Sequence, residues 1–469
     1  ANEAIERVVL NGKARAYGLE VLFRKNHGQF TGWIAYTLSR TEQQIEGRTP
    51  EETGINNGQW YRTGYDKLND ISVVGNYKLD EKWRFGANFS LQTGQPVTFP
   101  NGQYEYNGIT VPSYSLRNEN NLPTYHRLDV SATLTPASNT GRKWQGEWVF
   151  GIYNVYNRMN AAAITFQQNK ETANNEAILL SIFGFIPSVT YNFKFSTMKL
   201  FNNISLLFLV ISFIGCEKVI DVDLDTAPPK LVVEASINWD KNTTGNEQFI
   251  KLTTTTDYFS STIPNVTGAT VFITNSSGTV FNFVEVTEPG IYVCNNFEPV
   301  INESYTLTIV NNGETFTATE KLLATPEITR IEQNNEGGIL GDEIEVRFFY
   351  DDIPNVANYY LQQIDDPYKV IPEFGVLEDR FFQNNELFGL YFSEDLKSGD
   401  ELTFTLNGIT QNHYNYMNIL LSQAGGGSGG PFSTPTSTIR GNVVNQTNFN
   451  NFALGYFRLS ERAKIAYVI

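Results

Sequence analysis

The feature that most constrains this chain is a hydrophobic segment in its middle, residues 198–216, which has the form of a secretory signal peptide. Lys199 gives the start of this segment a positive charge, an apolar run follows over 204–214, and Cys216 is the last residue. The run is too short to span a bilayer, which takes about 20 residues. A signal peptide acts at an N-terminus, yet 197 residues precede this one. We therefore expect two proteins joined end to end, each with its own fold.

The net charge of the chain changes sign at this segment. Residues 1–197 carry 19 Lys and Arg against 17 Asp and Glu, a net of +2, whereas residues 198–469 carry 15 against 33, a net of −18. This asymmetry favours two polypeptides from different settings over a single domain. Neither half contains a basic stripe interleaved with aromatic residues, so we expect no nucleic-acid partner.

Several runs in residues 1–195 alternate polar and apolar side chains, with lengths that suit tilted membrane strands of about 9–11 residues. They cover residues 14–24, 30–39, 66–78, 83–95, 125–135, 148–156 and 187–195. Short connections alternate with long ones at 42–64, 96–124 and 157–185, which is typical of short periplasmic turns and long extracellular loops. The sequence predicts a partial transmembrane β-barrel of about seven antiparallel strands. The alternative is a soluble β protein with an aromatic core.

The last predicted strand places Tyr191, Phe193 and Phe195 on one face, and we predict these residues as a barrel C-terminal signal. Residues 1–195 resemble the C-terminal part of a SusC-like TonB-dependent receptor in the phrases ARAYGLEVLFRK, FGANFSLQTGQPVTFP, GIYNVYNRMNA and IPSVTYNFKF. The resemblance implies part of a large barrel that encloses a plug and imports substrate with energy from TonB. We expect this piece to transport nothing by itself, because an open barrel leaves unpaired strand edges in lipid.

Polar residues near the start of the strand at 125–135 are candidates for contact with a substrate: Arg117, His126 and Arg127. The alternative, which we favour, is that they close loops by hydrogen bonds. With three His in the chain and no set of nucleophile, base and acid, we expect neither an enzyme nor a cofactor.

Cys216 ends the hydrophobic segment as the cysteine of a lipoprotein signal does. In such a signal the thiol takes a diacylglycerol and the new amine can be acylated, since one acyl chain alone holds a protein only marginally. Ile214-Gly215 fits the pattern, while Phe213 departs from it. We predict Cys216 as a lipidation site; cleavage elsewhere and a buried core helix are the alternatives.

Residues 196–216 therefore form a junction where one protein's C-terminus meets the next protein's N-terminus. We expect that two neighbouring genes have been read as one, through readthrough of a stop codon or a sequencing error. A genuine gene fusion is the alternative. Sequencing the DNA across codons 190–200 distinguishes the two, because a clean reading frame without a stop contradicts the first explanation.

Residues 217–325 contain seven short strand-like runs separated by turn signals such as Asn311-Asn312-Gly313. This pattern predicts an immunoglobulin-like or fibronectin-like β-sandwich. Pro326 marks a boundary, and residues 326–469 are predicted to form a second β-rich, sandwich-like domain with a short helix at 414–424. The expected fold class is all-β: a partial barrel, a signal-peptide helix and two β-sandwich-like domains.

Three features of the second half could be taken for ligand-binding sites, but each has a simpler explanation. The glycine run at 424–431 fits G-x-G-x-x-G, but no strand leads into it and no GK[ST] follows. Asp351-Asp352 and Asp365-Asp366 lack the spacing of a calcium loop, so we expect solvated surface acids, with a calcium site as the alternative. Cys294 is expected to be a small buried hydrophobe. We predict no metal site.

Residues 217–469 resemble an uncharacterised family of outer-membrane lipoproteins, a domain of unknown function, in the phrases KLVVEASI, EPGIYVCNN, SYTLTI and ALGYF. Genes of that family commonly lie directly downstream of TonB-dependent receptors. The resemblance therefore implies an accessory lipoprotein with no assigned chemistry.

The sequence as a whole predicts an outer-membrane component of TonB-dependent nutrient uptake, whose lipoprotein part binds or presents a ligand or acts as a lid. The expected partners are outer-membrane lipid, a full-length TonB-dependent receptor or neighbouring barrel strands, and an unknown small ligand or oligomer. The expected location is the cell outer membrane, with the lipoprotein part tethered there and surface-exposed. The main alternative is a structural or adhesive surface lipoprotein with no transport role, and an enzyme comes third.

Overall fold

The structure is a computed structural model. It describes residues 10–48, 53–137, 144–169, 174–181, 183–195, 216–338, 341–354, 356–380, 384–424 and 437–469. The chain divides into two compact units. The first contains residues 1–99, 114–223 and 428–437, and the second contains residues 100–113, 224–427 and 438–469.

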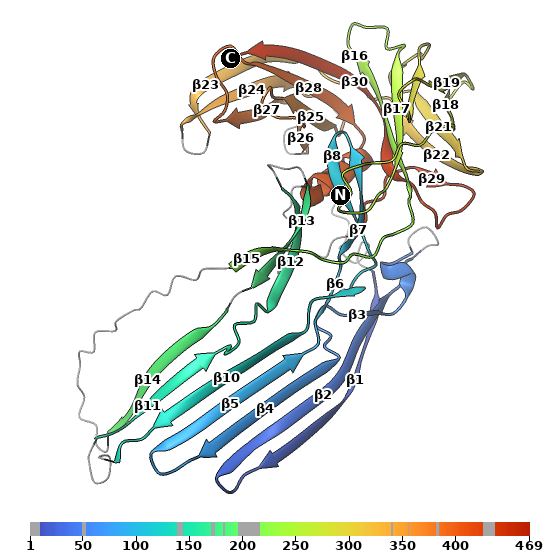
Figure 1. Ribbon diagram of the computed structural model, residues 1–469. Coiled ribbons are helices and arrows are strands. Elements are labelled where there is room, and N and C mark those ends of the chain that lie inside the picture. The colour runs from blue at the N-terminus through green and yellow to red at the C-terminus, as the bar shows by residue number, and fades with distance from the viewer. Residues whose placement is uncertain are drawn as a thin grey trace. The chain divides into compact units, whose positions relative to one another are not determined.

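Seven long antiparallel strands form the main sheet of the first unit (Figure 1). In spatial order they are β1 (Gly12–Lys25), β2 (Phe30–Ile45), β4 (Asn69–Lys78), β5 (Trp83–Gln92), β10 (Tyr125–Leu134), β11 (Trp144–Tyr153) and β14 (Ile186–Phe195), and the short β3 (Tyr61–Arg62) pairs with β2. The seven strands predicted from the sequence therefore form as one curled sheet. Among the described strands, β1 and β14 each have one neighbour in this sheet, so both of its edges are open.

The two faces of this sheet differ in chemistry, because side chains alternate along each strand. On one face, cross-strand neighbours follow one another from β2 to β14 as Phe30, Tyr77, Phe85, Ala132, Phe150 and Val189. The neighbouring row on the other face reads Thr31, Asn76, Gly86, Ser131, Gly151 and Ser188. The apolar face is solvent-exposed within this unit, with Phe30 at 53% and Val189 at 64%. One side of the sheet is thus continuously apolar and the other polar.

The long connections of the first unit carry short elements. These are the 3₁₀ turn η2 (Ile55–Gly58), the pair β6 (Pro96–Val97) and β9 (Asn120–Asn121), and a three-stranded sheet of β12 (Ala161–Gln168), β13 (Asn175–Ser181) and β15 (Cys216–Ile220). The sequence predicted only a loop at 157–185, where β12 and β13 form. β15 follows the predicted signal peptide and pairs with β13, so it joins segments from both sides of the junction.

A 12-stranded sheet organises the second unit. In spatial order its strands are β26 (Glu373–Glu378), β25 (Tyr359–Asp365), β28 (Glu401–Ile409), β30 (Leu454–Val468), β16 (Leu231–Asp240), β17 (Gln248–Thr254), β20 (Ile291–Cys294), β19 (Val280–Glu285), β18 (Thr270–Asn275), β21 (Ser304–Asn311), β22 (Glu314–Lys321) and β29 (Val444–Asn445). The other strands are β23 (Ile328–Gly337), β24 (Glu343–Asp351) and β27 (Glu386–Ser393), which pair with one another, and the hairpin of β7 (Pro100–Tyr106) and β8 (Ile109–Tyr114).

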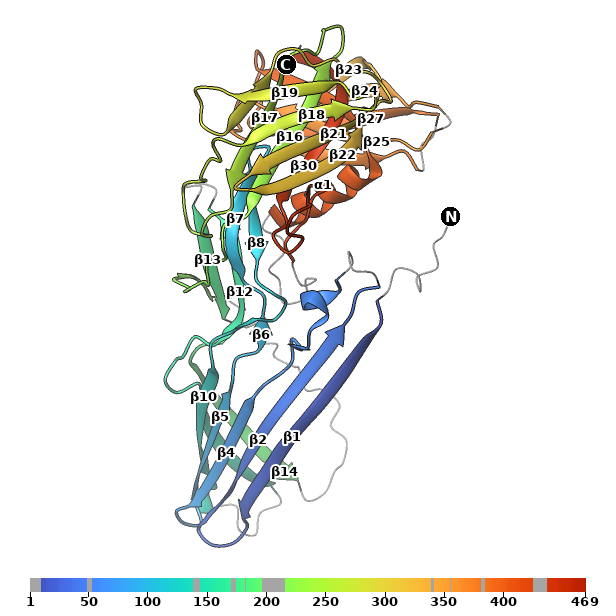
Figure 2. The ribbon, with the colours of Figure 1, turned by 90° about the vertical axis from the view of Figure 1, so that its right-hand side faces the viewer.

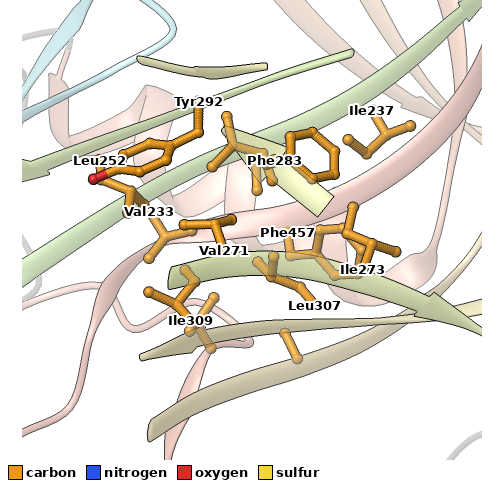
Figure 3. Close-up of a cluster of buried hydrophobic side chains, with 14 of the residues drawn as sticks. Val233, Ile237, Leu252, Val271, Ile273, Phe283, Tyr292, Leu307, Ile309 and Phe457 are labelled. Carbon is orange, nitrogen blue, oxygen red and sulfur yellow. The ribbon is translucent and has the colours of Figure 1, made fainter. Parts of the chain in front are cut away.

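Strands β16 to β22 are the seven runs predicted in 217–325, and they fold around a buried hydrophobic core (Figure 3). Val233, Ile273, Leu307 and Phe457 in this core are fully buried. Cys294 lies in the same core as a free thiol, which confirms the interpretation of that residue as a small buried hydrophobe. The prediction of an all-β fold with an immunoglobulin-like or fibronectin-like part is confirmed.

Strand β30 connects the two parts of the 12-stranded sheet. It pairs in parallel with β16 and antiparallel with β28, so Pro326, where the sequence predicted a domain boundary, lies within one compact unit. The three-stranded sheet of β23, β24 and β27 packs its aromatic rings against the 12-stranded sheet. The ring centroids of Phe348 in β24 and Phe404 in β28 are 4.9 Å apart. A second buried core, distinct from that of β16 to β22, therefore lies under β23, β24 and β27.

The helix α1 (Gln411–Ala424) begins three residues before the predicted start at 414. Among the described residues, no helix has the length and apolar character needed to cross a membrane. The predicted signal-peptide helix lies outside the described residues, except for Cys216, which begins β15.

Candidate functional site

The hairpin β7–β8 is the most unusual element of the second unit, because its sequence lies between β5 and β10 of the other unit. Its turn, Asn107-Gly108, has positive φ at both residues, 51° and 76°, as a type I′ hairpin turn requires. The side chains of Tyr104, Tyr106 and Val111 are fully buried. They share a cluster with residues of β16, β25, β28, α1 and β30, and Figure 2 shows the hairpin beside β16 and β30.

Polar contacts fix the hairpin at three further points. The backbones of Gln103 and Thr256 exchange two hydrogen bonds, at 2.8 and 2.9 Å. Lys251 Nζ lies 2.6 Å from Glu105 Oε1. The backbone N–H of Asn107 donates to Glu234 Oε2 at 3.0 Å. The hairpin is therefore held along its length and at its turn.

The cluster around the hairpin contains four buried tyrosines. Tyr104, Tyr106, Tyr416 and Tyr456 are all buried in it. The rings of Tyr106 and Tyr416 meet edge to face, with centroids 5.5 Å apart, and His413 lies against Tyr456 at 4.7 Å. Tyrosine-rich packing of this kind is more typical of protein interfaces than of domain cores.

Several buried polar atoms near the hairpin have no hydrogen-bond partner among the described residues: the hydroxyls of Tyr104, Tyr106 and Tyr416, both ring nitrogens of His413, and Nε of Arg458. Burial lowers the pKa of His413 well below its usual value, so the ring is neutral at pH 7. Each unpaired polar atom costs about 1–3 kcal/mol unless water reaches it. The packing beneath the hairpin is therefore polar and suited to trapped water.

Asn107 also lies on the wall of a polar cavity of about 780 Å³. The lining includes Glu234, Asp240, Lys251 and Arg462. Arg462 Nη2 donates to Asp240 Oδ2 at 2.8 Å, and this hydrogen bond lowers the pKa of Asp240. Burial raises the pKa of Glu234. Small-molecule sites occupy roughly 300–1,000 Å³, and charges of both signs at this wall suit a polar ligand.

The aromatic residues predicted as a barrel C-terminal signal lie on β14. Tyr191 and Phe193 are exposed on the apolar face, and the ring centroids of Tyr191 and Trp148 are 4.7 Å apart. The backbone of Phe195 pairs with Trp144, and its side chain lies outside the described residues. For Cys216 the structure describes the backbone alone, which pairs with Ser181. The signal and lipidation roles of these residues stay predictions.

The polar residues proposed as substrate contacts make hydrogen bonds to loops and strand ends of the first unit. His126 Nδ1 lies 2.8 Å from Tyr156 Oη. Arg127 forms an ion pair with Asp129 at 2.9 Å. The backbone N–H of Arg117 donates to Asn56 Oδ1 at 2.8 Å. These contacts agree with a loop-closing role.

The prediction that the paired aspartates are solvated surface acids is wrong for two of them. Asp352 and Asp366 are buried, because each accepts hydrogen bonds from groups that would otherwise be unpaired. Asp352 accepts from Tyr360 Oη at 3.0 Å, and Asp366 accepts from Tyr391 Oη and from the backbone of Tyr368 at 2.7 Å. The glycine run after Ala424 lies outside the described residues.

The hairpin and the cavity were not predicted from the sequence. A signal for the hairpin was present, because Asn107-Gly108 separates two runs with alternating buried residues, a strong hairpin pattern. The segment was instead predicted to be an extracellular loop, as part of the long connection at 96–124. The cavity could not be found this way, because its lining comes from segments as distant as Asn107 and Arg462.

Comparison with known proteins gives one clear match. A family model for a domain of unknown function, DUF4249, matches residues 217–466. No curated protein matches the chain.

Three solved structures are similar at low level. They are a two-domain fibronectin type-III segment of chicken tenascin (9% identity, 38% of this chain and 90% of that chain, TM-score 0.14), a DUF4785 family protein of Legionella pneumophila (10% identity, 86% and 90%, TM-score 0.17), and a tetra-tandem repeat of a large adhesion protein (11% identity, 96% and 99%, TM-score 0.14). TM-scores this low carry no argument about function.

Proposed function

We propose that this chain, which belongs to the DUF4249 family, is an outer-membrane component of TonB-dependent nutrient uptake. In this proposal, residues 1–195 are a piece of a SusC-like receptor barrel, and residues 217–469 are its accessory lipoprotein, joined through the junction and signal peptide at 196–216. The role is one of binding rather than catalysis.

The observation that carries this proposal is the continuous apolar face of the seven-stranded sheet. The row from Phe30 to Val189 crosses six strands without a charged or polar side chain other than the Tyr77 hydroxyl. A soluble sheet with such a face buries it against other protein, but Phe30, Phe85 and Phe150 are exposed within their unit. Lipid covers a face of this kind in a membrane barrel, where lipid-facing and lumen-facing residues alternate along each strand.

Thiol accessibility tests this assignment in the full chain. Val130 lies on the apolar face of β10, and its neighbour Ser131 lies on the polar face. In dodecylphosphocholine micelles we expect Val130→Cys to be protected from a charged, water-soluble thiol reagent, because detergent covers it, and Ser131→Cys to react. Mass spectrometry of the peptide containing the new Cys reads the modification. Equal reaction of both variants would contradict a lipid-facing sheet.

Lipidation at Cys216 gives a second prediction. In a Gram-negative host we expect the protein ending at Ile469 to begin at Cys216, to carry the mass of a diacylglycerol and to sediment with membranes. Cys216→Ser should abolish the added lipid mass and the sedimentation with membranes, because the serine hydroxyl cannot replace the thiolate nucleophile and each buried CH2 contributes about 0.8 kcal/mol to anchoring.

Cys294→Ser is the matched control, because Cys294 is the other cysteine of the chain and its thiol is buried in β20. This variant should keep the lipid. If Cys216→Ser remains with the membranes, the lipoprotein assignment is wrong.

A ligand-binding role for the lipoprotein is supported by the polar cavity beside Glu234 and Arg462. The accessory role predicts that the lipoprotein co-purifies with a full-length receptor. An adhesive or structural surface lipoprotein would be isolated without the receptor.

A further inference from the structure

We infer that the hairpin β7–β8 and the strand β15 form a two-point docking interface that holds the DUF4249 lipoprotein to its receptor barrel when the two are separate polypeptides. This inference rests on the proposed function, since it takes residues 1–197 as part of one protein and residues 198–469 as the other. The partner is thus a barrel whose long loops carry the hairpin β7–β8 and the strand pair β12–β13, to which β15 is added.

The hairpin is the first contact. Its sequence belongs to the barrel polypeptide, but its side chains complete the core of the DUF4249 domain, where Tyr104 and Tyr106 are fully buried. Without the hairpin, the domain would expose buried side chains of β16, α1 and β30, among them Val232, Met417 and Leu454. Exposed apolar surface of this kind marks a site for a partner.

The chemistry of this contact is that of an interface. Four buried tyrosines contribute to it, polar atoms such as Arg458 Nε and the ring nitrogens of His413 have no partner among the described residues, and an ion pair joins Glu105 to Lys251 at its edge. Protein interfaces are enriched in Tyr and Arg and retain water, and a few buried aromatic residues carry most of their binding energy. The core around Val233 and Ile273, in contrast, is built from residues of the lipoprotein alone.

The strand β15 is the second contact, in the opposite direction. Its residues follow the predicted cleavage site and belong to the lipoprotein, yet they extend the β12–β13 hairpin of the barrel polypeptide. The register runs from Ala177 opposite Ile220 to Ser181 opposite Cys216. Addition of a strand to a sheet edge is a common way to bind an extended segment, because main-chain hydrogen bonds supply the affinity.

This register also agrees with a lipid anchor on Cys216. Ser181 lies five residues before Ile186, the first residue of β14. Because a chain extends at most about 3.6 Å per residue and paired strands are about 5 Å apart, Cys216 lies within roughly 23 Å of β14. The pairing thus keeps the anchored residue near the end of a strand that we assign to the membrane.

The test uses the full chain with the recognition sequence of a specific protease inserted between Thr197 and Met198, so that both parts fold together before they are separated. After cleavage in detergent, the barrel part is immobilised and the dissociation of the DUF4249 part is followed over time. We expect the cleaved wild-type parts to stay associated.

Three changes should weaken the association. Tyr104→Ala with Tyr106→Ala should speed dissociation at least about 100-fold, since buried interface tyrosines are typical hot spots. Lys218→Pro with Val219→Pro in β15 should speed it roughly tenfold, because one of two successive N–H groups in an antiparallel edge strand faces its neighbour and is lost. Glu105→Lys should speed it about tenfold by placing like charges opposite each other.

Each change has a matched control. Tyr104→Phe with Tyr106→Phe should retain binding, because these hydroxyls have no partner among the described residues. Lys218→Ala with Val219→Ala should retain it as well, since both side chains are exposed. Lys251→Glu added to Glu105→Lys should restore it, which a misfolded variant would not do.

Dissociation of the wild-type parts at once on cleavage, or rates unchanged by both the alanine pair and the charge reversal, would overturn the docking interface. These results are independent of the thiol test at Val130 and Ser131. If the docking result holds while both thiols react equally, the interface stands and the membrane assignment fails. If the docking result fails while Val130→Cys is protected and Ser131→Cys reacts, the interface is wrong and the proposed function stands.

Discussion

A single arginine on the apolar face of the seven-stranded sheet, Val73→Arg, is expected to lower the stability of that sheet by about 2–4 kcal/mol in a lipid environment. Val73 lies in the middle of β4, opposite Ile34 on one side and Phe89 on the other. A guanidinium at this position would be surrounded by detergent or lipid chains, where a charge loses its hydration. Hydrogen exchange of β4 and β5 amides in dodecylphosphocholine micelles, read by mass spectrometry, measures the loss.

The matched control is Ser72→Arg, one residue earlier and on the opposite face. Ser72 has Ala35 and Ser90 as cross-strand neighbours, and a lumen-facing side chain stays in contact with water, so this variant should cost less than about 1 kcal/mol. Equal losses for the two variants would mean that both faces have the same surroundings, which is incompatible with a barrel wall.

The strands of both units were predictable because alternation with period two is a local property of the sequence. The run that became β4 shows Ile71, Val73 and Gly75 on one face and Ser72 on the other without reference to any partner. The same alternation identified β16 to β22. This local alternation was therefore sufficient to predict the strands and their two faces in both halves of the chain.

Pairing between distant strands could not be predicted in this way. Tyr104 and Tyr106 alternate with polar residues, as apolar residues do in any half-buried strand. Nothing in this local sequence indicates that Tyr416 and Val232 are their neighbours. The burial of Asp352 follows likewise from a tyrosine hydroxyl eight residues away and an amide from another segment. The packing of the hairpin β7–β8 and the cavity depend on such long-range contacts, so they appear only in the fold.

The second large effect is expected in β30, whose neighbours likewise come from distant parts of the sequence. Phe457→Ala in β30 is expected to lower the free energy of unfolding of the second unit by about 3–5 kcal/mol, because it removes a fully buried ring and leaves a cavity. Phe457 belongs to the same core as Ile273 and Leu307 (Figure 3). Hydrogen exchange of β18 and β21 amides at increasing urea measures the change. Phe449→Ala, at a ring that is 45% exposed, should change it by less than about 0.5 kcal/mol.

The same experiment decides whether Pro326 separates two domains thermodynamically. Because β30 pairs with both β16 and β28, loss of the Phe457 ring should weaken the strands on both sides of it. We therefore expect the amides of β25 and β28 to lose protection at the same urea concentration as those of β18 and β21. If β25 and β28 keep their protection, residues 217–325 and 326–469 unfold as independent domains despite sharing one sheet.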